Sequence, residues 1–350
     1  MFGLRARSQP SFPLLDGPLR PNDALEEADA LALPDPNDLC VAPDGSLLVS
    51  SGNRLLRYGR WSDDRAEQVA EFDGTISALA CRDDGLLAAG IEGGGVRILE
   101  QDGRASAGLY EADIELRGVT ACLFAENGDL VVADAAPSGD PYPYTRELFA
   151  GHGAGRIVRI AADGATSTLA SGLRCPHGVV QVSNETFMIS DCWASGLRST
   201  GAGAAFNELP GYPARIHRRQ GGGYILACLA RRDPLIDFIR TEDAFAERMM
   251  ADIEPAFWVA PRLSAETDHR YPVQAGATRL FGETKPWAPS LSYGLVVLLD
   301  DDFAPVGSLH SRANGTRHGV TAAIEWGGDI VAVSKGSGEL LRVKQSGGQS

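Results

Sequence analysis

Residues 174–199, RCPHGVVQVSNETFMISDCWASGLRS, read as a compact unit of strands and turns. An apolar strand at residues 178–182 is followed by a polar turn at 183–186 and a second apolar strand at 187–192. A glycine-containing turn then leads into a third strand. Short apolar runs bounded by Gly, Asn and Ser predict an antiparallel meander.

The same unit recurs along the chain. Six copies begin near Asn37, Ile76, Val119, Gly178, Tyr212 and His318. Most neighbouring copies are about 40 residues apart, a spacing typical of the four-stranded blades of a propeller. A sandwich of unrelated hairpins, the alternative, would not need this regular spacing. We therefore predict an all-β fold, a six-bladed β-propeller, with insertions at about residues 136–154 in blade three and 231–290 in blade five.

The two ends of the chain predict how the ring closes. Residues 1–24 contain four prolines and are expected to form an extended arm. The sixth copy supplies only three strands, and an unpaired sheet edge is a liability. We therefore expect residues 25–33 to pair with residues 339–343 as the outer strand of the last blade, although a short helix is the alternative. One propeller domain would then span residues 25–345.

Composition and charge narrow the classes of partner. The net charge of −14 is spread evenly, which argues against nucleic acid and against an anionic membrane surface. Apolar runs stay below the roughly 18 residues that a membrane span needs, and the N-terminal stretch lacks the apolar core of a secretory signal. We expect a cytoplasmic protein whose partner is a small molecule.

The six cysteines carry no metal or redox motif. Five of them fall inside or at the end of predicted strands, and no pair has CxxC spacing. Buried free thiols are the expected state.

Both insertions predict helices. The first has a short helical pattern at Thr145–Ala150 and brings Tyr142, Tyr144 and His152 to one face of the ring. The second starts a helix at Asp233-Pro234, a capping residue followed by a first-turn proline. It continues with an apolar stripe at Phe245, Met249 and Ile253, with Ala246 and Met250 beside it. We expect the stripe to be buried against the ring, as a fixed helix or as a mobile lid.

Three motifs carry a family resemblance. They are GYPARI at residues 211–216, GGGYILACLARR at 221–232 and GVTAAIEWGGDIVAVSKGSGELLRV at 319–343. Together with both insertions, they resemble the strictosidine-synthase-like branch of the calcium-dependent lactonase propellers, the superfamily of gluconolactonase and the paraoxonases. The resemblance covers about residues 35–345 and implies the same fold.

The resemblance also implies where a metal would bind. In the metal-dependent members, acidic and amide side chains at the starts of the innermost strands hold one calcium ion. The matching positions here are Asn37, Thr120, His177 and Ala214, so none of the four is a carboxylate. Calcium prefers anionic oxygen ligands, and we predict that it does not bind tightly. The cofactor is either absent or one divalent metal ion, with Asn37 and His177 as the remaining candidate ligands.

The condensing enzyme of the branch moves protons with a glutamate on its last blade. The matching residue here is Thr321, whose hydroxyl cannot replace a carboxylate with a pKa near working pH. Condensation of an amine with an aldehyde is therefore disfavoured. Asp38, next to Asn37, is a further candidate carboxylate for catalysis.

A pair of histidines offers different chemistry. His177 and His318 occupy equivalent positions, each followed by Gly-Val, and we expect both to open toward the same end of the channel. A neutral imidazole there can act as a general base or ligate a transition metal, and Arg215 can hold an oxyanion. The alternative is that each histidine only hydrogen-bonds a neighbouring blade. The candidate substrate-binding residues are Tyr142, Tyr144, His152, Arg174, Trp193, Tyr212 and Arg317.

Two function classes stay open. The first is a hydrolase of lactones or related esters, with catalysis at the channel mouth by His177, His318, Arg215, Asp38 and Thr321. The second is a metal-free tailoring enzyme of specialised metabolism or a non-catalytic small-molecule binder. Fold does not decide between them.

Overall fold

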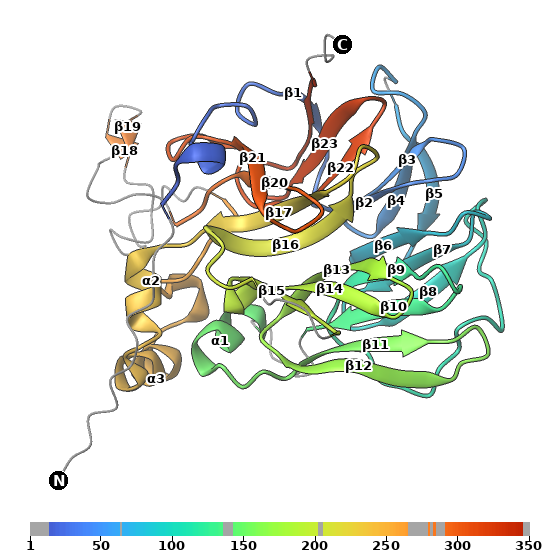
Figure 1. The fold of residues 1–350 in the computed structure, drawn as a ribbon, viewed down its shortest axis with the longest axis horizontal. Helices are drawn as coiled ribbons and strands as arrows, with labels where there is room; N and C mark the ends of the chain where they lie inside the picture. Colours follow the sequence, from blue (N-terminus) through green and yellow to red (C-terminus); the bar gives the residue numbers. More distant parts are fainter. Residues whose placement is uncertain are drawn as a thin grey trace.

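The structure is a computed structural model that describes residues 14–63, 65–135, 143–201, 206–264, 279–280, 283–284 and 291–345. Within them, six antiparallel sheets of three or four strands follow one another around a common centre in sequence order (Figure 1), and β18 (Arg279–Leu280) and β19 (Glu283–Thr284) form a separate two-stranded sheet. This confirms the predicted six-bladed β-propeller. No helix in these ranges is long and apolar enough to cross a membrane.

The first three blades follow the predicted repeat. Blade one contains β2 (Pro36–Val41), β3 (Leu47–Ser51), β4 (Arg54–Tyr58) and β5 (Glu67–Glu71). Blade two contains β6 (Ile76–Cys81), β7 (Leu87–Ile91) and β8 (Gly95–Leu99), and blade three β9 (Val119–Phe124), β10 (Leu130–Asp134), β11 (Gly155–Ile160) and β12 (Thr166–Leu173). The turns after the first strands place Gly45, Gly85 and Gly128 at φ of 80°, 92° and 87°, a region that favours glycine.

The other three blades complete the ring. Blade four contains β13 (Pro176–Ser183), β14 (Thr186–Asp191) and β15 (Gly196–Ser199), and blade five β16 (Gly211–Arg218), β17 (Tyr224–Arg231), β20 (Leu295–Leu299) and β21 (Pro305–His310). Blade six contains β22 (Val320–Trp326), β23 (Asp329–Ser334) and β24 (Glu339–Val343), and β1 (Asp29–Ala32) is its outer strand. Buried side chains of adjacent blades pack face to face, as Leu39 and Val49 do with Ile324 and Val331.

Closure of the ring follows the sequence-based prediction. β1 pairs antiparallel with β24, with Leu31 opposite Leu340, so the strand predicted within residues 25–33 is confirmed. Arg317 Nη1 donates to the backbone carbonyls of Leu25 (3.0 Å), Glu26 (2.8 Å) and Ala28 (2.6 Å). Its guanidinium therefore fixes the segment that leads into β1.

The helices of the insertions lie together on one side of the ring (Figure 1). They are α1 (Pro143–Ala150), α2 (Pro234–Ile239) and α3 (Asp243–Asp252). Asp233 caps α2 as predicted, since its carboxylate accepts a 2.8 Å bond from the amide of Leu235. Short elements complete the description: η1 (Gly17–Leu19), η2 (Cys192–Ala194), η3 (Pro255–Phe257), β18 (Arg279–Leu280) and β19 (Glu283–Thr284).

The apolar stripe of α3 is only partly buried, so the expectation that the whole stripe is buried against the ring is not met. Ala246 and Met249 are buried beside Trp258, and α3 contacts α1 and α2. Phe245 and Ile253 stay 55% and 45% exposed. The stripe is wider than the surface that α1, α2 and Trp258 offer, which leaves one edge of it in solvent.

Candidate functional site

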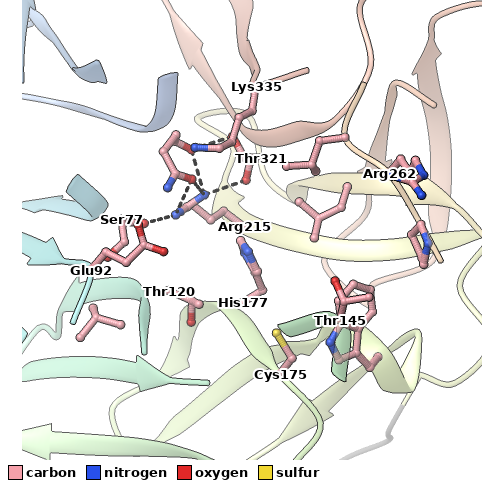
Figure 2. Close-up of a pocket in the computed structure, with 16 residues that line it drawn as sticks. Ser77, Glu92, Thr120, Thr145, Cys175, His177, Arg215, Arg262, Thr321 and Lys335 are labelled. Carbon is pink, nitrogen blue, oxygen red and sulfur yellow. Dashed lines mark hydrogen bonds between the residues drawn. The ribbon is translucent and has the colours of Figure 1, made fainter. Parts of the chain in front are cut away.

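A cavity of about 290 Å³ lies where the innermost strands converge, and every blade contributes to its wall (Figure 2). The residues that represent blades one to six are Asn37, Ser77, Thr120, His177, Arg215 and Thr321. Thr145 of α1 and Arg262 and Leu263 of the blade-five insertion add to the wall. The two insertions thus lie at the end of the channel where this cavity opens.

Arg215, on the innermost strand of blade five, directs both terminal nitrogens of its guanidinium at oxygens of the protein and holds Nε in ionic contact with Asp38. Its Nε lies 2.9 Å from Asp38 Oδ2, and Nη1 donates to the carbonyls of Asn37 (2.9 Å) and Thr321 (3.1 Å). Nη2 donates to the carbonyl of Ser77. The side chain is 3% exposed. The predicted role as an oxyanion-holding group is therefore wrong, because the N–H groups are used by the protein itself.

Asp38 is likewise used by the protein. One carboxylate oxygen accepts from the amide of Leu39 (2.8 Å) and the other from that of Leu79 (2.7 Å), in addition to the Arg215 contact. Burial raises the pKa of Asp38 to about 6, while Arg215 and the two amides oppose this rise. At neutral pH the group is a buried carboxylate that joins blades one, two and five. The expectation of a catalytic carboxylate is not met, since the cavity wall does not include Asp38.

Thr321 and Thr120 also use their hydroxyls between blades. Thr321 Oγ1 donates to the carbonyl of Asn37 (2.6 Å), and Thr120 Oγ1 donates to that of Pro176 (2.6 Å). Both residues are nearly fully buried at the cavity wall. Thr321 therefore closes the contact between blades six and one, and the expected part in proton transfer does not fit this geometry.

His177 is the histidine that faces the cavity. It lies beside Arg215 in Figure 2, and its Nδ1 is buried without a hydrogen-bond partner among the described residues. Burial, reinforced by the positive charge of Arg215, lowers the pKa of His177 to about 3. The imidazole is thus neutral at pH 7 and is a weak base.

His318 does not share this cavity, so the expectation that both histidines open at the same place is wrong. It is fully buried, with Nδ1 2.7 Å from Ser292 Oγ and Nε2 2.8 Å from the carbonyl oxygen of Arg312. Strand pairing shows that the blade-six position equivalent to His177 is Thr321: His177 lies between the paired residues Pro176 and Gly178, and Thr321 between Val320 and Ala322. His318 precedes β22 and is not equivalent to His177. The ring of His318 bonds Ser292, just before β20, and the carbonyl of Arg312, just after β21, and it is not part of the cavity wall.

The predicted substrate-binding residues separate into two groups. Trp193 lines the cavity, and Tyr212 packs behind it with ring centroids 5.4 Å apart. His152 is 76% exposed and lies 3.7 Å from Glu147, outside the cavity wall. Arg174 also lies outside the wall, and its backbone amide donates to Asp191 (2.7 Å). Arg317 serves ring closure, so the substrate role expected of it is wrong; Tyr142 and the side chain of Tyr144 lie outside the described residues.

Several wall residues were not singled out from the sequence. Ser77 opens the innermost strand of blade two, the position equivalent to Asn37, and the repeat alignment could have identified it. Lys335, between β23 and β24, also lines the cavity, with Nζ 2.8 Å from Asp35. Cys175 lines the cavity as a buried free thiol. The other five cysteines are also free, as predicted.

The residues at the channel centre do not fit a divalent metal ion. Asn37 presents its carbonyl and, at 3.4 Å, its Oδ1 to the guanidinium of Arg215. The oxygens that face the centre therefore already surround a positive charge. Among the described residues there is also no group of three or more His, Cys, Asp or Glu side chains that could hold a metal. No chemistry is therefore derived through a bound metal.

Comparison with known proteins finds solved structures with a similar fold. No protein family model and no curated protein matches the chain. The calcium-binding protein regucalcin from Agrobacterium tumefaciens is similar in structure, with a TM-score of 0.55 and 12% identity over 89% of this chain and 90% of that one. A proposed gluconolactonase is also similar, with a TM-score of 0.54 and 12% identity over 91% of this chain and 93% of that one. A luciferin-regenerating enzyme has a TM-score of 0.54 and 11% identity over 92% of this chain and 94% of that one.

The fold is that of the regucalcin- and gluconolactonase-type propellers. At these identities the similarity extends to the fold alone. Function has to be argued from the cavity.

Proposed function

We propose that this propeller binds a small, uncharged organic molecule in the channel-mouth cavity and needs no metal ion to do so. The observation that carries the proposal is a set of unpaired polar atoms. Ser77 Oγ, His177 Nδ1 and Trp193 Nε1 are buried without a hydrogen-bond partner, and all three residues line this one cavity. An unpaired buried polar atom costs about 1–3 kcal/mol. A ligand that supplies partners after small side-chain adjustments recovers part of that cost.

The chemistry of the wall favours an uncharged ligand with oxygen acceptors. Trp193 can only donate, Ser77 can donate or accept, and neutral His177 can do either. Arg215 is neutralised by Asp38, and Lys335 is paired with Asp35. The third cation of the wall, Arg262, donates to the carbonyls of Ala256 (2.6 Å) and Trp258 (3.2 Å). A carboxylate would therefore have to compete with existing contacts of all three cations. Val119, Leu229 and Leu263 provide apolar surface for the body of the molecule.

Hydrolysis of a lactone or related ester is the second candidate. It is supported by the neutral imidazole of His177 in a cavity of ester-sized volume and by the fold shared with a proposed gluconolactonase. The low pKa of His177 makes it a weak base, so the geometry favours binding over proton transfer. The strictosidine-synthase-like branch and a cytoplasmic location remain proposals; the six free thiols are in keeping with a reducing compartment.

A thermal-shift screen tests the proposal. The probes are uncharged lactones, esters, ketones and polyols, each paired with a carboxylate of similar size, and product formation is followed in the same wells. A compound present at 100 times its Kd stabilises the fold by about 2.7 kcal/mol. We expect uncharged compounds to raise the melting temperature and their carboxylate counterparts to have no effect.

Two variants locate the binding site. Leu229→Trp fills the cavity and should abolish the shift, whereas Val306→Trp changes a 53% exposed side chain and should keep it. Each variant is compared with its own unliganded baseline. A hit that shifts Leu229→Trp as much as the wild type, or hits found only among the carboxylates, would contradict the proposal. Turnover lost on His177→Gln would favour the hydrolase.

A further inference from the structure

The guanidinium of Arg215 is surrounded by oxygen atoms. The neutral oxygens are the carbonyls of Asn37 (2.9 Å), Thr321 (3.1 Å) and Ser77, together with Asn37 Oδ1 at 3.4 Å. The single anionic oxygen is Asp38 Oδ2, 2.9 Å from Nε. All the groups involved are buried or half-buried.

These contacts use both terminal nitrogens of the side chain, while Nε is in ionic contact with Asp38. A guanidinium has five N–H groups and no acceptor. Those on Nη1 and Nη2 are directed at the carbonyls of Asn37, Thr321 and Ser77 and at Asn37 Oδ1. Nε lies 2.9 Å from Asp38 Oδ2 but makes no hydrogen bond of normal geometry with any described residue. A ligand in the cavity therefore meets a charge that is already coordinated.

The position of the guanidinium follows from the order of the blades. Arg215 belongs to blade five, and Ser77 belongs to blade two, directly opposite in a ring of six. A side chain that bonds both to its own neighbours and to the opposite blade reaches the channel axis. Figure 2 shows the hydrogen bonds converging on Arg215 from Ser77 and Thr321. The charge thus sits where the innermost strands meet.

Oxygen ligands around a central charge are also what a hard divalent cation requires. We propose that Arg215 is a built-in cation: its guanidinium occupies an oxygen-lined cation site at the channel centre, and removing it converts the centre into a site for a divalent metal ion. The role is independent of which molecule binds in the cavity above. It also explains how one carboxylate and four neutral oxygens can face one another at the centre, because the guanidinium lies between them.

Calcium titration of Arg215→Ala tests the proposal. The variant leaves one carboxylate and four neutral oxygens, and such a low charge count favours weak sites, with Kd of about 0.1–1 mM. Calcium in the millimolar range should therefore raise its melting temperature saturably, and a chelator should reverse the rise. Wild-type protein should show no change with calcium or chelator.

Two control variants make the result specific. Arg215→Ala combined with Asp38→Asn removes the carboxylate that contacts Arg215 and should abolish the calcium effect. Arg156→Ala exposes no channel oxygens but likewise leaves a buried carboxylate, Asp134, without its 2.9 Å partner. It should not be stabilised by calcium. Calcium-dependent stabilisation of the wild type, or an equal effect in Arg215→Ala and the double variant, would overturn the proposal.

A second comparison applies if Arg215→Ala does not fold in the absence of metal. Refolding is then carried out with and without calcium, and the proposal expects folded protein only with calcium. Arg215→Lys, which keeps a cation, should also be more stable than Arg215→Met, which keeps only apolar volume. If calcium does not rescue Arg215→Ala, or Arg215→Met is the more stable of the pair, a built-in cation is not what the centre requires.

Discussion

Nε of Arg215 and Oδ2 of Asp38 are 2.9 Å apart, and both side chains are more than nine-tenths buried. The pair joins the innermost strands of blades five and one. Because the amides of Leu39 and Leu79 also bond the carboxylate, Asp38 is held from two blades besides that of Arg215. The channel centre is therefore an ionic cross-link rather than an open metal site.

Breaking this pair from one side should be costly. Arg215→Met leaves the Asp38 carboxylate buried without its partner, a change that typically costs about 3–5 kcal/mol. Combining it with Asp38→Asn removes the uncompensated charge and should recover part of that loss. Urea unfolding of the two single variants and the double variant gives the coupling energy. Strictly additive losses would mean that the two groups do not stabilise each other.

Acid should destabilise the fold through His310. This histidine is fully buried, with Nδ1 3.1 Å from the hydroxyl of Tyr293 and Nε2 2.8 Å from Ser308 Oγ. Burial lowers its pKa to about 4. A lowered histidine pKa favours the neutral folded form, so its contribution is fully present above about pH 6.5 and is lost as pH falls toward 4.

The matched variants for this test are His310→Gln and His152→Gln. Between pH 7 and pH 5 the wild type should lose about 2 kcal/mol of unfolding free energy through His310. His310→Gln should lack this part of the pH dependence, whatever its stability at pH 7. His152 is 76% exposed, and its replacement should leave the pH dependence unchanged. Parallel pH profiles for wild type and His310→Gln would contradict the assignment.

Ring closure should depend on Arg317. Its Nη1 is shared by three carbonyls just before β1, and Nε lies 3.5 Å from Glu339 of β24. Arg317→Ala removes this shared donor from partly buried carbonyls, at a cost of about 1–3 kcal/mol. Amide exchange at Asp29–Ala32 should accelerate more than exchange in β2. Uniform protection across both strands would show that the arginine is not needed for closure.

Sequence patterns predicted the fold because propeller blades repeat their strand and turn chemistry. The glycine turns, the missing fourth strand of blade six and the Asp233-Pro234 helix start each depend on local residues, and each was found where expected. Contacts between residues far apart in the sequence could not be predicted from local patterns. Nothing local to Arg215 indicates that it reaches Ser77, 138 positions away in the sequence.

Part of the candidate site was also predicted, because the propeller blades repeat. The starts of the innermost strands were expected to converge, and Asn37, His177, Arg215 and Thr321 do line one cavity. Their roles were misjudged where a side chain bonds its own protein, as Arg215, Asp38 and Thr321 do. Hydrogen-bond demand between blades therefore decides which polar residues remain available to a ligand.

His177 and His318, which share the local sequence His-Gly-Val, should respond to substitution in opposite ways. His318→Ala removes a fully buried ring that bonds Ser292 and the carbonyl of Arg312, and it should cost about 2–4 kcal/mol of stability. His177→Ala removes a ring that faces the cavity and carries an unpaired nitrogen, so it should change stability little. It should instead weaken binding of any compound found in the screen, because a cavity contact is lost. Urea unfolding and thermal-shift titration of both variants separate the two roles. A stable His318→Ala or a His177→Ala that binds like the wild type would reverse the assignment.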